Sequence, residues 1–375
     1  MSRVMEEEAA RRPLLGVRVV EATSYVLGPF AALQLADLGA EVVKVEPPKG
    51  GDPMRRFGQR VNGTSLAFAN CNRNKRSVFL DLKSADGAAA LGELLAGADV
   101  FLSNWRPAVA ERLGFSADAV RARYPRLVWV RVTGFGQDGP LADLPAFDAI
   151  VQARSGYAAR ADGDAALGLG YLADKVTGTF AAQAALAALL QRDRTGAGSV
   201  VDVAMLDAMA YFDSPDIFAG HTIEGRHDPD MLRHLGAVRP VRTADGWIVV
   251  SPVSGRQLST TVTVVGHPEW IDELRSYGNA ADMTVGLHDR LDRVLPTRTT
   301  AHWEDVFAEA DVPASAVFDV DAHLADPQVR HNAVYRVGDD PVLGRTRRAR
   351  HAARFDGEPV TTDDLPVPPV PEADG

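Results

Sequence analysis

Buried strand patterns separated by helical patterns fill the first 140 residues, and this alternation constrains the fold more than any other feature. Apolar and β-branched runs predict strands over residues 16–22, 41–46, 76–82, 99–103 and 126–134. Helical patterns cover 29–40, opened by proline and closed by glycine, and 84–98. Strands spaced by helices in this way predict an α/β fold with a parallel, doubly wound sheet.

The second half of the chain changes character. A long helix is predicted over 174–193, followed by a strand at 199–205 and a further helix from Leu206. The stretch 241–252 reads as a hairpin around an Asp245-Gly246 turn. Hairpins and short helices from about 225 to 320 indicate a smaller second domain. The proline-rich, acidic residues 359–375 predict an extended or flexible tail.

Composition excludes several classes of function. The chain has 375 residues and a net charge of -10, which disfavours a nucleic-acid partner, so a phosphate-bearing ligand needs a local basic patch. The single cysteine, Cys71, excludes a disulfide framework and a cysteine-based zinc site, and we interpret it as a small buried residue rather than a reactive thiol. We expect no membrane span and a cytoplasmic location, because no secretory signal or long apolar run is present. We expect no metal, because the sequence has no cluster of metal-ligating residues.

The stretch "GFGQDG" at 134–139 matches the glycine pattern of dinucleotide-binding proteins and follows a predicted strand. That function requires a helix to begin there, so that its N-terminus meets the pyrophosphate. Pro140 and Pro145 prevent a regular first turn, so we interpret the stretch as a connector.

Two basic stretches stand out in this acidic chain. Guanidinium and ammonium groups at strand ends can bind phosphate, although a solvated sheet edge gives the same pattern. The first stretch carries Arg73, Lys75, Arg76 and Lys83, and the second carries Arg106 and Arg112 around Trp105.

Asp174 stands at the start of the long helix, before a flexible, glycine-containing turn at Thr177 and Gly178. As an N-cap or first-turn residue it stabilises the helix by about 0.5–2 kcal/mol. The helix N-terminus also lowers the pKa of a carboxylate, and an ionised carboxylate can act as a nucleophile toward an activated acyl group. The local sequence is compatible with both roles.

Taken together, these motifs resemble the class III CoA-transferases, the family of formyl-CoA transferase and the carnitine CoA-transferases. The likeness covers nearly the whole chain and includes "GPFAALQLADLGAEVVKVEPPKGGDPMRRFG", "NKRSVFLDLK", "FLSNWRPAVAERLGF" and "DKVTGTFAAQAALAALLQRDRTGAGSVVDVAMLDA". The resemblance places the catalytic aspartate at Asp174. It also implies CoA-contacting or ligand-lining positions at Leu80, Asp81, Leu82, Lys83, Asn104, Trp105, Arg106, Arg112, Phe147 and Asp148.

The resemblance further implies a large Rossmann-like domain built from both chain ends, a small domain, and an interlocked homodimer. On this basis we divide the chain into an extension (1–13), the large domain (14–224 and 321–358), the small domain (225–320) and the tail (359–375). Acyl-CoA and a carboxylic acid are the implied substrates, with coenzyme A as co-substrate. In the implied mechanism Asp174 forms an acyl anhydride and then an aspartyl-CoA thioester, with oxyanions held by backbone N–H groups at the helix start.

The sequence also departs from formyl-CoA transferase. Val26 replaces a glutamine, and Tyr25, Val26, Leu27 and Phe147 indicate a larger or more apolar acyl group than oxalate or formate. One alternative is an α-methylacyl-CoA racemase, but that reaction uses a histidine where this chain has Phe147, which cannot transfer protons. A second alternative is a catalytically silent acyl-CoA-binding protein.

Overall fold

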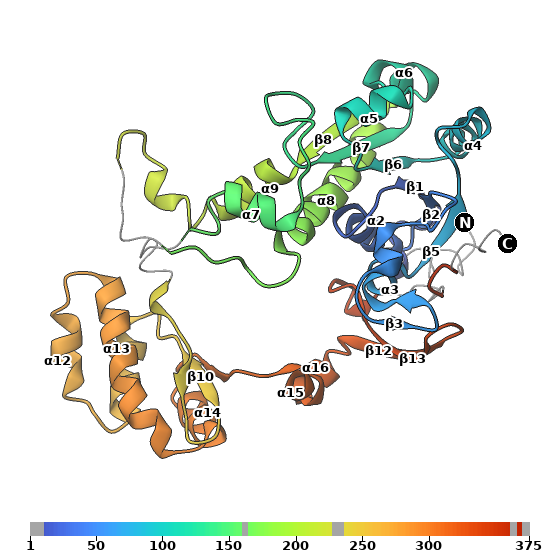
Figure 1. Cartoon of the computed structure of the whole chain (residues 1–375). Coiled ribbons are helices and arrows are strands. Elements are labelled where there is room, and N and C mark those ends of the chain that lie inside the picture. Colours follow the sequence, from blue (N-terminus) through green and yellow to red (C-terminus); the bar gives the residue numbers. More distant parts are fainter. Residues whose placement is uncertain (1–10, 160–163, 227–235, 361–365, 370–375) are drawn as a thin grey trace. The chain divides into compact units, whose positions relative to one another are not determined.

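The structure is a computed structural model and describes residues 11–159, 164–226, 236–360 and 366–369. The chain divides into two compact units, and each is described by itself (Figure 1). Unit 1 comprises Met1–Ala158, Leu167–Phe212 and Ala333–Gly375, and unit 2 comprises Ala159–Ala166 and Asp213–Asn332. The residues predicted as a small domain, 225–320, fall within unit 2, which extends beyond them at both ends.

A six-stranded parallel sheet forms the centre of unit 1, as the alternating pattern predicts (Figure 1). Its strand order is β5-β2-β1-β6-β7-β8. The strands are β1 (Arg18–Ala22), β2 (Glu41–Glu46), β5 (Lys75–Phe79), β6 (Val100–Ser103), β7 (Val128–Thr133) and β8 (Val200–Ala204). The chain builds outward from β1 to β5, then returns and builds outward from β6 to β8 on the other side. This reversal leaves a crevice at the carboxyl ends of β1 and β6, where open α/β sheets bind ligands.

Each face of the sheet has its own apolar core, because successive strand residues point to opposite faces. On β6, Val100 and Leu102 belong to one buried cluster and Phe101 to another. On β7, Val128 and Val130 join the first cluster and Trp129 the second. The strands are therefore buried on both sides, which explains their nearly continuous apolar sequences.

Helices cover both faces. The helices of unit 1 are α2 (Leu27–Asp37), α3 (Leu66–Asn72), α4 (Ala85–Ala96), α5 (Pro107–Arg112), α6 (Ala117–Arg123), α7 (Asp148–Arg154), α8 (Leu172–Thr195) and α9 (Met205–Asp213). Residues of α2, α7, α8 and α9 belong to the first cluster, and residues of α4 and α6 to the second.

Gly178 in α8 permits close packing against α2 rather than loosening the helix start, so the predicted flexible turn is wrong. A Cβ atom at Gly178 would lie 2.8 Å from the backbone oxygen of Leu27 and 3.1 Å from Cδ1 of Phe30. Gly178 itself is buried within a continuous helix. Its lack of a side chain permits the short distance between α8 and the first turn of α2.

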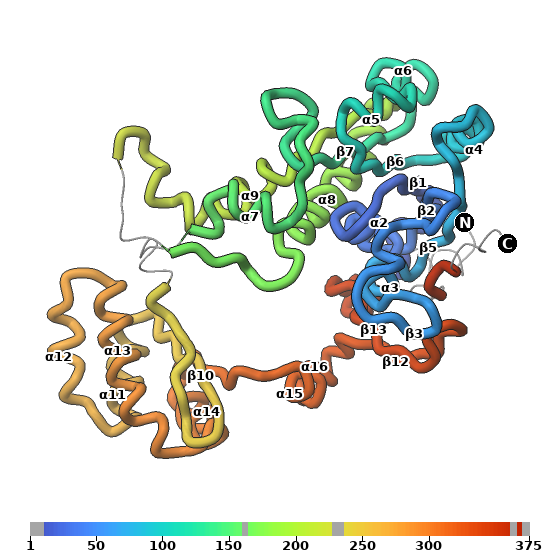
Figure 2. Tube along the Cα trace, in the orientation of Figure 1, coloured from blue at the N-terminus to red at the C-terminus, as the bar shows by residue number. Residues whose placement is uncertain are grey.

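The C-terminal part of unit 1 packs beside its N-terminal part (Figure 2). Short antiparallel pairs occur here: β3 (Arg60–Val61) with β4 (Thr64–Ser65), β12 (Tyr335–Asp340) with β13 (Gly344–Ala349), and β14 (Arg354–Phe355) with β15 (Glu358–Pro359). The 3-10 turn η1 (Pro53–Arg56) precedes β3. Val367 is buried against Val26, Met54 and Phe68, so the prediction of a flexible tail is wrong at that residue. Residues 361–365 and 370–375 lie outside the described residues.

Unit 2 combines a three-stranded antiparallel sheet with helices. The strand order is β11-β10-β9, and β9 and β10 flank the predicted Asp245-Gly246 turn. Buried Ile248, Trp303 and Phe307 share one core. The elements are β9 (Val241–Arg242), β10 (Trp247–Val250), β11 (Ala314–Ala316), α11 (Gly255–Val264), α12 (Trp270–Arg275), α13 (Ala280–Val294), α14 (Thr300–Glu309), α15 (Val320–Ala325), α16 (Pro327–His331), η2 (Ala219–His221) and η3 (Leu295–Thr297).

Candidate active site

A cavity of about 350 Å³ lies in unit 1 at the carboxyl edge of the sheet. The loops that follow β1, β6 and β7 line it, together with the start of α8 and the first residue of α9. Five of the predicted site residues line this cavity: Asn104, Trp105, Arg106, Phe147 and Asp174. The reversal of strand order thus brings together residues from segments that are far apart in the sequence.

Reciprocal hydrogen bonds connect the loops after β1 and β6. The backbone N–H of Ser24 donates to Oδ1 of Asn104 at 3.1 Å, and Nδ2 of Asn104 donates to the Ser24 carbonyl at 3.0 Å. Tyr25, the next residue, has a φ of 68°, which is unusual for a residue with a side chain. Its N–H donates to Oδ1 of Asp52, and its ring meets that of Phe147 edge-on, with centroids 5.2 Å apart. These contacts hold two aromatic side chains at the cavity.

A buried charge network supports the same loop from below. Glu21 is completely buried and bonds to Nζ of Lys44 at 2.9 Å and Nζ of Lys75 at 2.7 Å. Lys44 also contacts Oδ2 of Asp52 at 3.0 Å and donates to the Thr23 carbonyl at 2.9 Å. Burial lowers the pKa of Lys75 to about 8, despite the opposing charge of Glu21. The network joins β1, β2, β5 and the segment at Asp52, so it fixes the floor of the loop that presents Tyr25.

Asp174 does not cap its own helix. The N-cap of α8 is Tyr171, whose side chain makes no capping hydrogen bond, and Asp174 is in the first turn. The N–H of Asp174 instead donates to Oδ1 of Asp148 at 3.1 Å. The other Asp148 oxygen accepts from Nε2 of Gln152 at 2.5 Å, and Oε1 of Gln152 accepts from the N–H of Gly168 at 2.8 Å. Asp148 therefore caps α8 from a separate helix and fixes the backbone of Asp174.

The pKa of Asp174 is raised to about 7, which overturns the prediction that the helix N-terminus lowers it. Partial burial is the larger cause, and the negative charge of Asp148 is the second. The dipole of α8 favours an anion here, but Asp148 already accepts the N–H of Asp174. A carboxylate that costs free energy to ionise in this position is a more basic group than an exposed aspartate.

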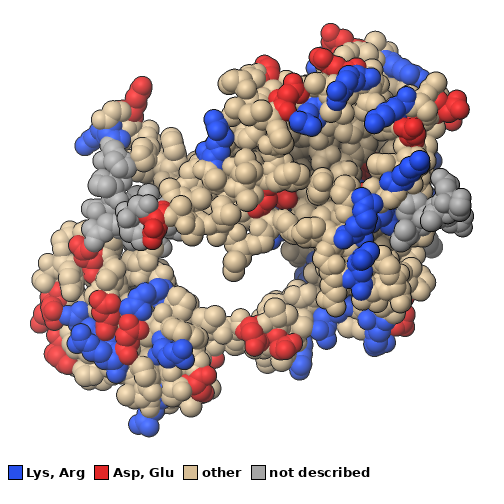
Figure 3. All heavy atoms as spheres, viewed as in Figure 1, with Lys and Arg blue, Asp and Glu red and all other residues tan. Residues whose placement is uncertain are grey.

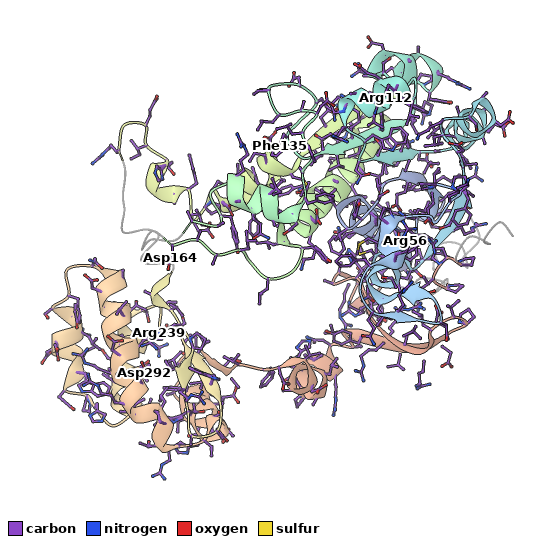
Figure 4. The ribbon with its side chains drawn as sticks, viewed as in Figure 1. Arg56, Arg112, Phe135, Asp164, Arg239 and Asp292 are labelled. Atoms are coloured by element: carbon purple, nitrogen blue, oxygen red, sulfur yellow. The ribbon has the colours of Figure 1, made fainter. Side chains whose placement is uncertain are left out.

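The remaining predicted site residues lie outside the cavity lining. Leu80 and Leu82 pack in the same apolar cluster as Trp105, on the loop after β5. Asp81 and Lys83 are exposed on that loop, where Oδ1 of Asp81 accepts the N–H of Lys83 at 3.1 Å. Arg112 is exposed at the end of α5, where Figure 4 labels it with Phe135, another residue of unit 1.

Three of the four cations in the first basic stretch are paired with carboxylates, and the fourth, Lys83, is exposed on the loop after β5. Lys75 is buried against Glu21, Arg73 pairs with Asp37, and Arg76 pairs with Glu41 on the surface. Sequence reasoning failed here because the neutralising carboxylates come from β1, α2 and β2, which are distant in the chain.

Val26 was also misplaced by sequence reasoning. Tyr25 and Leu27 line the cavity, but Val26 is buried on the other side, against Met54 and Phe68. The left-handed conformation of Tyr25 alters the direction of the loop, and no residue-type signal at a tyrosine reveals it. Burial raises the pKa of Cys71, which fits the interpretation of a partly buried, unreactive thiol.

The glycine pattern, metal-ligating groups and long apolar helices were considered in the sequence, and the described residues bear on each. The helix that follows "GFGQDG" begins at Asp148, so no helix starts at the glycines, as predicted. Within the described part of the chain, no three His, Cys, Asp or Glu side chains are grouped to hold a metal ion. Across the same residues, none of the helices has the length and apolar character that a bilayer crossing requires.

Comparison with known proteins gives consistent matches. The model of CoA-transferase family III matches residues 14–374. The chain is 31% identical over 355 residues to succinyl-CoA:glutarate CoA-transferase of Mus musculus, which covers 92% of this chain and 81% of that protein. It is 34% identical over 321 residues to acetyl-CoA:oxalate CoA-transferase of Acetobacter aceti, covering 82% and 81% respectively.

Two solved structures share the architecture. A CAIB/BAIF family protein from Brucella suis superposes with a TM-score of 0.81 at 26% identity, over 96% of this chain and 97% of that one. A hypothetical protein from Mycobacterium tuberculosis superposes with a TM-score of 0.80 at 29% identity, over 95% and 96% respectively.

Proposed function

We propose, from the premise that the chain belongs to CoA-transferase family III, that it transfers CoA between carboxylic acids through covalent intermediates on Asp174. The observation that carries the proposal is the Asp174 carboxylate itself, which lines a cavity at the carboxyl edge of the sheet beside Asn104, Trp105 and Arg106. Its N–H is fixed by Asp148, so its backbone is held in one position.

The proposed reaction has four balanced steps. An oxygen of Asp174 attacks the thioester carbonyl carbon of the donor acyl-CoA, forming an acyl anhydride and releasing CoA thiolate. The thiolate attacks the aspartyl carbonyl carbon, forming an aspartyl-CoA thioester and releasing the donor acid. The acceptor carboxylate then attacks this thioester, and the freed thiolate attacks the acceptor carbonyl of the new anhydride. Acceptor acyl-CoA leaves, and the Asp174 carboxylate is restored.

The environment of Asp174 supports this role. A raised pKa makes the ionised carboxylate more nucleophilic than an ordinary aspartate, at the cost of partial protonation near neutral pH. The N–H of Asp174 already donates to Asp148, so we assign stabilisation of the oxyanions to other donors. Nδ2 of Asn104 is likewise engaged with the Ser24 carbonyl.

We assign CoA to the crevice between the loops after β1 and β6, consistent with a Rossmann-like arrangement of unit 1. Arg106 and the ring of Trp105 lie at the cavity, where a guanidinium can pair with a phosphate. Leu80, Asp81, Leu82, Lys83 and Arg112 remain candidates for the outer part of the same molecule, on the loop after β5 and the end of α5.

The acyl group is proposed to be apolar and to lack a second carboxylate. Among the described residues that line the cavity, Arg106 and Asp174 are the charged ones, whereas Tyr25, Leu27 and Phe147 offer apolar surface. A second carboxylate on the acyl group would need a cation of its own.

A racemase reaction is disfavoured, because it needs a second proton carrier opposite Asp174. No histidine is found among the described residues that line the cavity, and Phe147 occupies the position that the racemase resemblance assigns to one.

We further propose a homodimer. Large apolar side chains of unit 1 stand exposed, with Leu169 at 98%, Tyr211 at 71% and Leu190 at 60% exposure. Light scattering of the purified chain should give twice its mass of 40.2 kDa, and a monomer would refute the proposal. A division into a large domain at both chain ends with a small inserted domain, and a cytoplasmic location, remain predictions.

Trapping the covalent intermediate tests the mechanism. The full chain is incubated with apolar and dicarboxylic acyl-CoA thioesters, treated with hydroxylamine, and digested for mass spectrometry. A hydroxamate at Asp174, formed best with apolar donors, is expected. Asp174→Asn should abolish transfer yet retain CoA binding, whereas Asp193→Asn, an exposed change in the last turn of the same helix, should leave transfer unchanged.

Each other result has a distinct meaning. Full activity in Asp174→Asn would refute covalent catalysis at this residue. CoA binding without any hydroxamate across the panel would favour the silent acyl-CoA-binding protein. Preferential trapping with dicarboxylic donors would refute the proposed acyl class alone.

A further inference from the structure

A second cavity, of about 50 Å³, lies in unit 1 between the end of α2, the end of α3 and the hairpin β12–β13. None of the residues that line it also lines the Asp174 cavity. Its guanidinium side chains are those of Arg73, Arg336, Arg348 and Arg350, and the imidazole of His351 lies among them. Two carboxylates, Asp37 and Asp339, share the lining, so guanidinium groups outnumber carboxylates there.

This concentration of arginine is unusual in a chain with a net charge of -10. Residues 344–355 contain five arginines and one histidine and no acidic residue. In Figure 3, Lys and Arg side chains gather over the part of unit 1 that carries α3 and the hairpin β12–β13 in Figure 1. Four guanidinium groups and two carboxylates line the cavity, so its lining carries an excess of positive charge in an acidic chain.

Hydrogen bonds hold these side chains in defined positions. Nη2 of Arg73 pairs with Asp37 and also donates to the Ala349 carbonyl at 2.9 Å. Nη2 of Arg348 pairs at 2.5 Å with Asp340, which is buried. Nη2 of Arg336 donates to the Val360 carbonyl at 2.6 Å.

Arg350 and His351 are fixed in the same way. Nε of Arg350 donates to the Ala333 carbonyl at 2.9 Å. Nδ1 of His351 accepts the N–H of Ala353 at 3.2 Å, so in the neutral ring Nε2 carries the proton and remains a donor. Prepositioned donors of this kind lose little conformational entropy when they bind an anion.

The pKa values of Arg350 and His351 also indicate that this cluster favours a bound anion. The pKa of Arg350 is lowered by burial and then by the charges of Arg354 and Arg336. The pKa of His351 is lowered by burial, although Asp37 opposes the shift. An anion in the cavity would relieve this repulsion between like charges.

We propose that this cavity binds a phosphate group, either as inorganic phosphate or as the terminal phosphate of a small metabolite. Its volume holds a few water molecules, which matches one tetrahedral oxyanion better than an extended ligand. Planar guanidinium groups pair with phosphate oxygens in a bidentate manner. A bound phosphate would connect Arg73 at the end of α3 with Arg336 and Arg350 around the hairpin, and so fasten the C-terminal part of unit 1 to its N-terminal part.

Gly338 provides a test that removes no existing contact. It lines the cavity from β12, and a Cβ atom added there meets nothing within 4 Å. Gly338→Glu places a carboxylate among the arginines, and Gly338→Gln is its neutral, isosteric control. Arg336→Gln is a second variant, with Arg347→Gln as its control, because Arg347 is exposed on the same hairpin and outside the lining.

The experiment is calorimetric titration of the full-length chain with inorganic phosphate and with methyl phosphate, at constant ionic strength in chloride. We expect binding to the natural chain, to Gly338→Gln and to Arg347→Gln. Gly338→Glu and Arg336→Gln should each weaken it by about tenfold or more, as for loss of a charge-assisted bond. Tight binding of inorganic phosphate alone indicates the free anion, and equal binding of methyl phosphate indicates a phosphomonoester.

Three outcomes overturn the proposal. The first is that neither ligand binds the natural chain, and the second is that both ligands bind all variants equally. The third is that CoA affinity falls in parallel with phosphate affinity in Gly338→Glu. The last result would assign these arginines to CoA instead. Acyl transfer is measured separately on each variant, so failure of the proposed transferase function leaves this test intact.

Discussion

Asp148 is expected to control the pH at which Asp174 becomes active. The pKa of Asp174 is about 7, with burial as the main cause and the charge of Asp148 as the second. For a nucleophile with that pKa, about one tenth is ionised at pH 6 and about nine tenths at pH 8. The single-turnover rate of acylation should therefore rise about tenfold over this interval, and the rising limb should have its midpoint near pH 7.

The substitution Asp148→Asn removes the second cause while retaining an oxygen that accepts the N–H of Asp174. Loss of a neighbouring like charge lowers a carboxyl pKa by about one unit. The ionised fraction at pH 6 then rises from about one tenth to about one half, so the rate at pH 6 should increase about fivefold relative to the variant's own plateau. The plateau rate of the variant at high pH should fall, because an asparagine NH2 cannot accept the hydrogen bond from Gln152. The midpoint of the pH–rate curve does not depend on the height of this plateau.

The assay is quenched-flow acylation by a donor thioester from pH 5 to 9. Asp207→Asn, an exposed change on α9, should leave the midpoint unaltered. An Asp148→Asn midpoint equal to that of the natural chain, or higher, would refute the electrostatic account.

The pH dependence of stability offers an independent check on the pKa of Asp174. Because the folded state binds the Asp174 proton more tightly, folding free energy is lost as pH rises from 3.8 toward 7, so Asp174→Asn should have the higher melting temperature at pH 8.

Three further predictions concern the architecture that supports the site. Glu21→Gln leaves the ammonium groups of Lys44 and Lys75 without their shared buried carboxylate, so the free energy of unfolding should fall by about 3–5 kcal/mol in urea titrations. Gly178→Val places branched atoms where the backbone of α2 already lies, so it should lower the free energy of unfolding by about 2 kcal/mol or more and also lower kcat. An unchanged melting temperature would contradict the close packing of α8 against α2. His288 is buried in unit 2 with a lowered pKa, so the unfolded chain binds its proton more tightly and stability should decline as pH falls below 6.5; His288→Asn should flatten that decline.

Exposed counterparts serve as controls for these changes. Glu41→Gln disrupts a surface ion pair with Arg76 and should cost less than about 1 kcal/mol. If Glu21→Gln lowered the free energy of unfolding by no more than Glu41→Gln does, the buried network would not be important for stability. In unit 2, Asp311→Asn removes the exposed partner of Arg256 and should not alter the acid limb attributed to His288.

The parallel sheet of unit 1 could be predicted because its signals are local. The inner strands are short apolar runs buried on both faces, and the helices between strands have start and stop signals of their own. The Asp245-Gly246 turn and the position of Asp174 in the first turn of α8 were predictable for the same reason. Short-range periodicity and turn chemistry need no knowledge of distant residues.

The pairing of charged groups, the pKa of Asp174 and the directions of side chains could be determined only from the tertiary structure. Lys75 resembled a phosphate ligand in the sequence, but β1 supplies Glu21 as its buried partner. The pKa of Asp174 rises rather than falls because its surroundings exclude water and, secondly, because α7 brings Asp148 to the start of α8. Val26 is directed away from the cavity by the left-handed turn at Tyr25.

The sequence by itself therefore determined which segments form strands and helices, and that an aspartate lies in the first turn of the long helix. The tertiary structure alone decided which charges are neutralised, how basic that aspartate is, and which side chains share the cavity. Secondary structure depends on neighbours within a few residues, whereas desolvation and Coulomb interactions depend on distances in space between groups that can be far apart in the chain.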